Sequence, residues 1–386
     1  MSAYIALGLI GEGLFAATQP SPFALNAFGT FVAAGFAGMF AGTLLFGWVS
    51  DHFGRRTTFT YSLLWYAAAT LIMAFAHSAA AIDFWRFVAG IGIGVQIITI
   101  DAYITEIAPK ERRGFWIAFS QFIGYLAIPC AALLAYLLVP HTYFGLAGWR
   151  YVAMAGSLGG VAVWFLRAGL PETSRWVAAR ERPSNALRTI FSRAYARRTV
   201  MLVIFNLVQT IGFYGFASWI PVLLASEGLT FAKSLQYAFV IAIVNPIGPI
   251  VAMAAADRWE RKVQIPVLAL AIAAAGLLFA RARVPAAMLF TGGSVALLNA
   301  WFSSIFHSYQ AELFPTRVRA RAIGFVYSWS RLSAVFAGFI ISAILRAYGT
   351  AGVFAAIAAA MVVAAAAVAT LGPRSTNVPL EALGAE

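Results

Sequence analysis

The stretch DAYITEIAPKERRG (101–114) nearly recurs as HSYQAELFPTRVRA (307–320). Each copy has a Glu, a Pro three residues later and an Arg four residues beyond the Pro, and the copies lie 206 positions apart. A second pair of stretches keeps the same offset, GWVSDHFGRR (47–56) and MAAADRWERK (253–262). A shared offset at separate landmarks indicates two similar halves in the same orientation, which is a parallel repeat.

The residues between these landmarks are strongly apolar. The chain has 386 residues, of which 62% are hydrophobic and 11% charged, and its mean hydropathy is +0.82. A soluble domain is about half apolar and about a quarter charged, and a membrane-spanning helix needs roughly 20 apolar residues. The pattern predicts an all-α membrane protein with twelve transmembrane helices. The predicted spans are residues 3–18, 24–48, 58–77, 81–107, 115–139, 148–169, 199–224, 231–256, 263–280, 285–313, 321–345 and 348–371.

The formal net charge is +13, and its distribution explains it without a nucleic-acid partner. If both termini are cytoplasmic, most of the 27 Lys and Arg fall in inner loops or at inner helix ends. This asymmetry is the positive-inside rule of membrane proteins. The sequence therefore predicts a multi-pass protein of a bacterial inner membrane, in contact with the lipid bilayer. The single cysteine, Cys130, lies in an apolar run and excludes a disulfide framework.

The repeat divides the chain into two bundles of six helices. We expect an N-terminal bundle over 1–170, a basic cytoplasmic linker over 171–198, a C-terminal bundle over 199–372 and a tail over 373–386. The first predicted helix is short, because only about 16 apolar residues precede Gln19 and Pro20. Its start is therefore expected to be incomplete.

Several motifs carry a resemblance to a known family. GWVSDHFGRR (47–56) resembles the loop motif of the major facilitator superfamily. RFVAGIGIG (86–94), EIAPKERRG (106–114), PETSRW (171–176) and ELFPTRVRA (312–320) are similar to motifs of its sugar-porter-like branch, which includes bacterial metabolite:proton symporters. The resemblance covers essentially the whole chain. It implies the major facilitator fold and secondary transport of a small molecule, in a protein that generally works as a monomer.

The duplicated charges fall at the inner ends of predicted helices. Water-exposed loop charges contribute only about 0–1 kcal/mol each, but topology alone does not require acids at fixed spacing. We expect ion pairs that hold helices together when the inner side is closed and separate when it opens. The candidates for this cytoplasmic gate are Asp51, Arg55, Arg56, Glu106, Arg113 and Arg175, with Asp257, Arg261, Glu312 and Arg319 in the second half.

Arg86 lies near the outer end of the span 81–107. A buried guanidinium costs several kcal/mol in a membrane unless it is paired or hydrated, and snorkelling to the interface is the alternative. Both a functional and a structural role stay open. The following glycines at 90, 92 and 94 thin the helix surface for close packing.

Few acids fall well inside the predicted spans, and Glu12 and Asp101 are the two that do. The repeat partner of Asp101 is His307. Because the fourth and tenth helices of the resembled fold face each other across its cavity, the two side chains could exchange a proton. We therefore expect proton coupling to involve Asp101, His307 and Glu12. The alternative is that Asp101 pairs with a cation of the inner gate.

Arg331 falls near the middle of the span 321–345, where it needs a partner, a wet cavity or an anionic ligand. A guanidinium binds a carboxylate bidentately, which suits an organic acid; a fixed pair with Asp101 is the alternative. Other polar side chains on apolar spans are candidates to line the same cavity. They are Gln96, Gln121, Asn206, Gln209, Tyr214, Asn245, Asn299 and Tyr327.

The function expected is proton-coupled symport of a small organic carboxylate. Trp219 and Trp301 could stack on an aromatic one, although Trp at interfacial depth is more often a membrane anchor. Sugar:proton symport and sugar uniport are the alternatives. The fifth predicted helix lacks the GPxxGG-like run of drug:proton antiporters, and only a short tail stands where a sensor carries a signalling domain. An enzyme is not indicated, and no metal or cofactor is expected, because the Cys and the His residues are scattered along the chain.

Overall fold

The computed structural model describes residues 5, 8, 9, 12–15, 28–167, 169, 171–173, 177, 186–217 and 231–378. Its first half contains α2 (Phe28–Phe53), α3 (Arg55–Ala74), α4 (Ala79–Ile107), α5 (Arg113–Leu138) and α6 (Gly148–Arg167). Its second half contains α9 (Ala196–Ala217), α11 (Phe231–Val244), α12 (Ile247–Ala255), α13 (Arg261–Arg281), α14 (Pro285–Glu312) and α15 (Arg319–Leu371). Short elements are the 3-10 turns η1 (Lys110–Arg112) and η2 (Thr316–Val318), the helix α8 (Ala186–Ile190), and the strands β1 (Thr142–Tyr143) and β2 (Leu146–Ala147).

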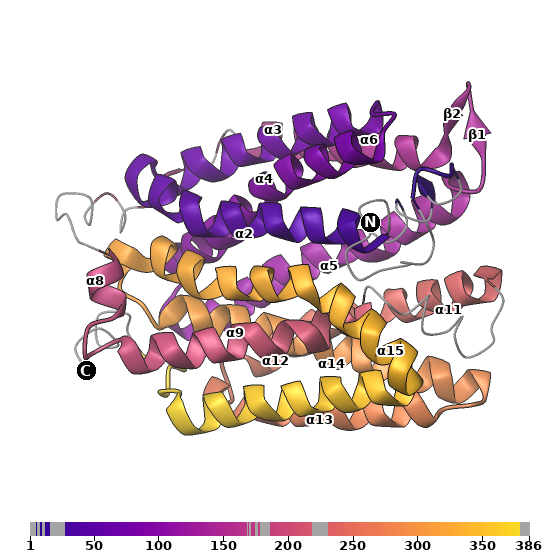
Figure 1. Ribbon diagram of the computed structural model, residues 1–386. Helices are drawn as coiled ribbons and strands as arrows, with labels where there is room; N and C mark the ends of the chain where they lie inside the picture. Colours follow the sequence, from indigo (N-terminus) through magenta and orange to yellow (C-terminus); the bar gives the residue numbers. More distant parts are fainter. Residues whose placement is uncertain are drawn as a thin grey trace.

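The long helices run roughly along one direction and form two stacked groups (Figure 1). In the first half α2 and α3 both pack on α4, and in the second half α9 and α13 pack on α15. The halves meet where α15 lies against α2 and where α5 lies against α11, α12 and α14. These helices correspond to predicted spans two to twelve and fall into the two halves that the repeat predicts.

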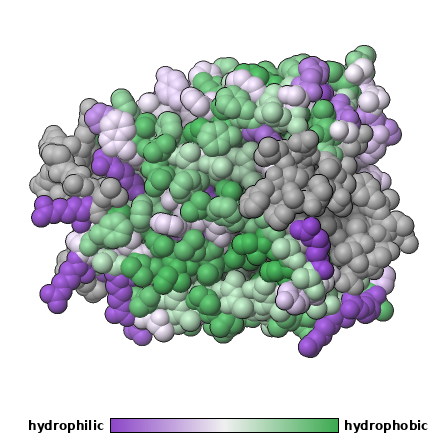
Figure 2. All heavy atoms as spheres, viewed as in Figure 1, coloured by the Kyte–Doolittle hydropathy of each residue, from purple (hydrophilic) through white to green (hydrophobic). Residues whose placement is uncertain are grey.

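The outer surface agrees with a membrane environment. Figure 2 shows apolar residues in a broad band across the middle of the molecule and hydrophilic residues toward its two ends. Large apolar side chains of the long helices are exposed, among them Leu45, Leu166 and Phe290. Among the described residues, 8 helical segments are long and apolar enough to cross a bilayer. The chain is therefore an integral membrane protein.

The first predicted span, residues 3–18, differs from the structure at its described residues. Residues 12–15 form a turn, in which the amides of Leu14 and Phe15 both donate to the carbonyl of Leu9. Gly13 has a φ of +72°, a left-handed conformation that commonly follows the end of a helix. The sequence predicted that Glu12 lies well inside a span, but the structure places it in a turn.

Two further helices depart from the predicted spans. The eighth span is broken between α11 and α12 at Asn245 and Pro246, because proline has no N–H to donate and crowds the preceding turn. Spans eleven and twelve run on as α15, with a sharp change of direction at Gly349, which has a φ of +64°. A hairpin of β1 and β2, absent from the prediction, turns through Phe144 and Gly145, both at positive φ.

Candidate functional site

A central cavity of about 310 Å³ lies between the two halves. It is bounded by α4 and α5 on one side and by α9, α14 and α15 on the other. Its volume is at the lower end of the range typical of small-molecule sites. The lining residues are Ile97, Ile100, Asp101, Ser120, Gln121, Gly124, Tyr125, Gln209, Phe213, Tyr214, Ser303, Phe306, His307, Tyr327 and Arg331.

The cavity preserves the sequence repeat. The α4 residues Ile97, Ile100 and Asp101 line it, and so do their α14 partners 206 positions later. On α5 and α15 the same offset relates Gln121 to Tyr327 and Tyr125 to Arg331. The two halves therefore present equivalent positions to the cavity but different chemistry, with the carboxylate on one half and the basic groups on the other.

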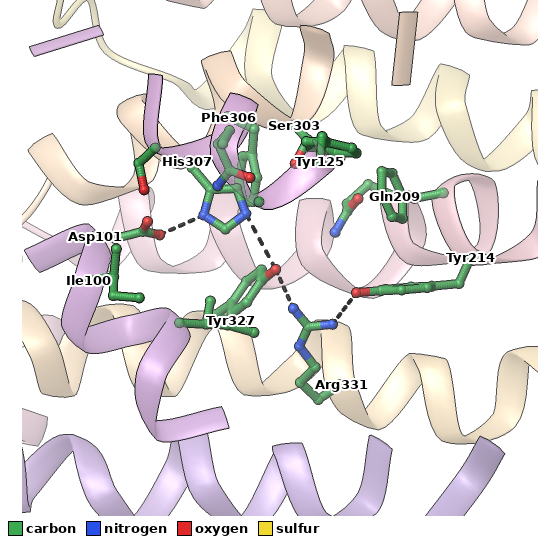
Figure 3. Close-up of a pocket in the computed structure, with 15 residues that line it drawn as sticks. Ile100, Asp101, Tyr125, Gln209, Tyr214, Ser303, Phe306, His307, Tyr327 and Arg331 are labelled. Atoms are coloured by element: carbon green, nitrogen blue, oxygen red, sulfur yellow. Dashed lines mark hydrogen bonds and ion pairs between the residues drawn. The ribbon is translucent and has the colours of Figure 1, made fainter. Parts of the chain in front are cut away.

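A continuous chain of polar contacts crosses one wall of the cavity (Figure 3). Asp101 Oδ2 lies 2.5 Å from His307 Nδ1, and this contact joins the two halves. His307 Nε2 lies 3.4 Å from the Tyr327 hydroxyl. The Arg331 guanidinium then donates to the hydroxyls of both Tyr327 and Tyr214.

Within this series of polar contacts, the charge of Arg331 is not balanced by an ion pair. Arg331 is 1% exposed, and the side chains that accept its hydrogen bonds are neutral hydroxyls. Within the described part of the chain no carboxylate forms an ion pair with it, and its Nε has no hydrogen-bond partner. Tyr327 also lies under the guanidinium, with the ring centroid 4.4 Å from Cζ, which adds a cation–π contact. The expected alternative of a fixed pair between Arg331 and Asp101 is not what the structure shows.

The structure brings five of the nine predicted substrate-binding residues to the cavity: Gln121, Gln209, Tyr214, Tyr327 and Arg331. The other four lie elsewhere. Asn206 is buried and donates to the Gln310 side chain, and Asn245 donates to the carbonyl of Ala242 at the α11–α12 break. Gln96 and Asn299 sit on α4 and α14 but are outside the lining set. Periodicity does not tell a helix contact from a cavity wall, so the sequence alone could not separate these four amides from the five that line the cavity, and their part in substrate binding stays a prediction.

The cavity also contains residues that sequence reasoning missed. Tyr125, Phe213 and Phe306 supply aromatic wall, and Ser303 adds a hydroxyl. The repeat could have found Tyr125, since it is the partner of the predicted residue Arg331. The predicted stacking residue Trp301 lies outside the lining set, and Trp219 is outside the described residues.

Glu12 is separate from the cavity. Its carboxylate accepts from Trp149 Nε1 at 2.7 Å and lies 3.4 Å from the Arg150 guanidinium. Arg150 is itself fixed by the carbonyls of Ala74 and Ala76. The geometry thus assigns Glu12 a structural contact between the first segment and the start of α6, and its predicted part in proton coupling stays a prediction.

Arg86 packs against α2. Its guanidinium lies over the ring of Phe31, 5.2 Å from the centroid, and a Cβ at Gly35 would meet its Nε at 2.8 Å. Arg86 is outside the lining set of the cavity. The contact with Phe31 favours a place between helices over snorkelling to the interface.

The predicted gate residues form a buried cluster at one end of the helices. In the first half Arg55 pairs with Glu106 at 3.2 Å, and in the second half Arg261 pairs with Glu312 at 2.9 Å. The two pairs are repeat partners. These side chains are buried and are therefore not water-exposed loop charges, whereas the side chain of Arg56 is exposed.

Other contacts of the cluster join one half to the other. Glu106 accepts from Arg319 at 3.3 Å, and its second oxygen accepts from Thr173 at 2.6 Å. Asp257 accepts from the backbone amides of Gly114 and Phe115 at 2.9 and 2.8 Å. The side chain of Asp51 and all of Arg175, both predicted gate residues, lie outside the described residues.

Residues 372–378, named here the C-terminal strap, return across this cluster. Thr376 accepts from the amide of Arg261 and Ser375 donates its amide to Glu260, both in the second half. The Val378 carbonyl accepts from Arg113 of the first half at 3.3 Å. The strap therefore touches both halves where they meet.

The comparisons with known proteins agree with this architecture. A sequence model of the Major Facilitator Superfamily matches residues 1–310, and the chain belongs to that family. It is therefore an integral membrane transporter and not an enzyme.

The predicted twelve-helix major facilitator fold is confirmed. Two relatives and one solved structure are similar to the chain over most of its length. The niacin transporter NiaP of Acinetobacter baylyi is 25% identical over 92% of this chain and 87% of its own. The inner membrane metabolite transport protein YdjE of Escherichia coli is 28% identical over 92% of this chain and 86% of its own. The fold matches that of the proton:xylose symporter XylE bound to 6-bromo-6-deoxy-D-glucose, from E. coli, with a TM-score of 0.83, 19% identity, and coverage of 100% of this chain and 95% of that one.

Proposed function

We propose that the protein is a symporter that carries a small aromatic carboxylate together with a proton through the central cavity. The observation that carries the proposal is Arg331, a guanidinium that is buried in the cavity wall and bonded to two neutral hydroxyls. A buried cation without an anionic partner among the described residues is suited to an anionic ligand. A carboxylate that reached Arg331 would gain charge-assisted hydrogen bonds.

The remaining walls favour an aromatic body for this carboxylate. Tyr125, Phe213, Tyr214, Phe306 and Tyr327 surround the cavity. Aromatic rings prefer offset-stacked or edge-to-face contacts with one another, and a cavity of about 310 Å³ suits a single ring with its substituents. The relative NiaP is named for niacin, a carboxylate on an aromatic ring, which supports this substrate class.

The proton site in this proposal is the pair of Asp101 and His307. The two side chains are 4% and 6% exposed and lie at the boundary between the halves. A carboxylate and an imidazole at 2.5 Å can share or exchange a proton. Because the pair faces the same cavity as Arg331, proton and substrate would be carried in one movement.

The halves rock about this cavity in the proposed cycle, and the inner charge cluster favours the state in which the inner side is closed. Glu106 with Arg319, and Asp257 with the start of α5, are the contacts that would have to separate. The proposal places both termini on the cytoplasmic side of a bacterial inner membrane. It also treats 1–170 and 199–372 as the moving halves of a monomer, with 171–198 as the linker and 373–386 as the tail.

A sugar is the second candidate substrate. Gln121, Gln209 and Ser303 offer amide and hydroxyl groups that could bond to sugar hydroxyls. The fold is shared with a proton:xylose symporter. A sugar would form no charge-assisted hydrogen bond with Arg331, which forms no ion pair among the described residues, and we therefore favour the carboxylate.

Uptake into proteoliposomes tests the choice of substrate. Purified protein is offered labelled nicotinate, benzoate and xylose, with and without an inward proton gradient. We expect accumulation of a carboxylate that collapses when the gradient is dissipated. Arg331→Gln should lower the apparent affinity about tenfold or more, because it removes hydrogen bonds to a charge.

The matched control is Arg281→Gln, which removes an exposed arginine at the end of α13, outside the cavity. It should transport like the wild type. Equilibration of xylose without carboxylate uptake would replace the proposal with sugar transport. Carboxylate uptake that survives Arg331→Gln unchanged would remove Arg331 from the site.

A further inference from the structure

The Tyr327 hydroxyl contacts both the proposed proton site and the proposed carboxylate site. Tyr327 lies on α15 one helical turn before Arg331, and its hydroxyl accepts from that guanidinium. The same hydroxyl lies 3.4 Å from Nε2 of His307 on α14. Figure 3 shows it between the imidazole and the guanidinium.

We propose that Tyr327 couples proton binding at His307 to carboxylate binding at Arg331, so that each ligand strengthens the other. Tyr327 is then a positioning residue for coupling, in addition to being part of the cavity wall. The inference rests on the proposed function, in which Arg331 binds the carboxylate and His307 with Asp101 takes up the proton.

The hydrogen-bond capacity of the Tyr327 hydroxyl limits how it can serve Arg331 and His307 together. A tyrosine hydroxyl has one hydrogen to donate, and its oxygen can accept. Arg331 cannot accept, so its N–H must donate to the Tyr327 oxygen. When His307 Nε2 carries no proton, the Tyr327 hydroxyl donates to it, while the Nδ1 hydrogen is directed at Asp101.

A proton arriving at Nε2 reverses the direction of this contact. The proton takes the nitrogen lone pair that the Tyr327 hydroxyl had used, and no other bond forms or breaks. The new N–H then points at the same oxygen to which Arg331 already donates. Two cationic groups now meet at one neutral oxygen in a buried site, where charges are weakly screened.

A carboxylate on Arg331 removes this conflict. It neutralises the guanidinium and competes for the N–H groups that the tyrosine hydroxyls accept, which leaves Tyr327 available to the imidazolium. Proton binding is therefore favoured when the carboxylate is present. By thermodynamic linkage the carboxylate must in turn bind more tightly when His307 is protonated.

The other charged or titratable groups around Tyr327 do not reverse this sign. Asp101 on α4 faces Nδ1 in both protonation states. Tyr125 on α5 and Tyr214 on α9 also lie near Tyr327, and both are neutral hydroxyls. Among the described residues Tyr214 contacts Arg331 without contacting His307, which makes it the natural control.

The test compares Tyr327→Phe with Tyr214→Phe, since each keeps its ring and loses one hydroxyl bonded to Arg331. Nicotinate and benzoate binding to the purified protein is measured by calorimetry between pH 6 and pH 8. In the wild type we expect the dissociation constant to fall severalfold as the pH falls. Tyr214→Phe should bind more weakly at every pH but keep that dependence.

Tyr327→Phe should flatten the dependence to less than about twofold over the same range. It should also exchange carboxylate across proteoliposome membranes while failing to accumulate it under a proton gradient. A Tyr327→Phe protein with the wild-type pH dependence would overturn the coupling role while leaving the proposed function intact. A wild type that binds neither carboxylate would overturn the proposed function, and the inference with it.

Discussion

Asp101 and His307 occupy one position of the repeat, and their side chains meet across the boundary between the halves. Both are buried, and a buried polar group is costly unless it is hydrogen-bonded. Removing one partner of a buried pair leaves the other without compensation. A transport cycle in which the halves separate at this depth would have to break and remake this contact.

Asp101→Asn should separate transport from accumulation. The amide keeps the size of the carboxylate but cannot bind or release a proton, so carboxylate exchange should persist. Accumulation under an inward proton gradient should fall to the equilibrium ratio of about 1. Uptake and counterflow in proteoliposomes measure the two quantities separately.

Asp83→Asn is the matched control, because Asp83 is the other aspartate of α4 and lies outside the cavity. It should accumulate substrate like the wild type. Gradient-driven accumulation by Asp101→Asn would exclude Asp101 as the proton site.

Sequence reasoning found the charged residues of the cavity better than its neutral ones. Asp101, His307 and Arg331 stood out because ionisable groups are costly in a membrane. Tyr125 and Phe213 did not, because an aromatic residue in an apolar span is expected wherever helices pack. The repeat offset was the stronger signal, since it relates Tyr125 to Arg331 and Ile97 to Ser303.

Glycines on two faces of α4 allow α2 and α3 to pack closely against it. A Cβ at Gly90 would meet the carbonyl oxygen of Gly35 on α2 at 2.3 Å, and one at Gly94 would meet the carbonyl oxygen of Met39 at 2.5 Å. Gly92 points the other way, where a Cβ would meet the carbonyl oxygen of Ser62 on α3 at 2.8 Å. The three glycines therefore let both neighbours approach the helix that presents Asp101.

Gly90→Val should destabilise the protein by forcing α2 and α4 apart. Overpacking of this kind typically costs about 1–3 kcal/mol, which corresponds to a fall of several degrees in Tm. Thermal unfolding of the detergent-solubilised protein measures the change. Gly159→Val is the control on α6, since a Cβ there meets nothing within 4 Å; an equal fall in both variants would contradict the packing argument.

At this scale the sequence predicted most helices closely. The span 81–107 became α4 at Ala79–Ile107, because its apolar run ends at polar or charged residues. The break at Asn245 and Pro246 and the hairpin at Phe144 were missed. Hydropathy detects neither feature. Pro246 breaks the helix because it has no backbone N–H to donate, and the hairpin depends on positive φ at two adjacent residues.

In the molecule as a whole, the two halves are joined at the buried charge cluster, which the proposed function places on the inner side. Glu106 is the centre of the first-half side, since it accepts from Arg55 of its own half and from Arg319 of the other. The Thr173 hydroxyl also donates to the Glu106 carboxylate. A single carboxylate thus holds several donors that would otherwise be buried together as like charges.

Glu106→Gln should shift the protein toward the state with its inner side open. The amide loses hydrogen bonds to charged donors, worth about 1.5–3 kcal/mol, which corresponds to a shift of about tenfold or more in the equilibrium. Ser120→Cys in a Cys130→Ala background places a thiol in the cavity. Its labelling by an impermeant maleimide in inside-out vesicles should become faster by a similar factor.

Glu111→Gln is the matched control, because Glu111 pairs with Lys110 at 3.8 Å on the exposed surface. Exposed pairs contribute little, so labelling should proceed at the wild-type rate. Unchanged labelling in Glu106→Gln would show that the cluster does not control access from the inner side.

The C-terminal strap is attached to both halves, so a separation of the halves would change its conformation. Thr376 is bonded to the second half and Val378 to the first, so the few atoms between them register any parting of the halves. Asn377 lies between the two attachments, and its side chain donates to the backbone carbonyl of Asp257. A spectroscopic label at position 377 would thus report the transport cycle in real time, from a point remote from the substrate and the proton.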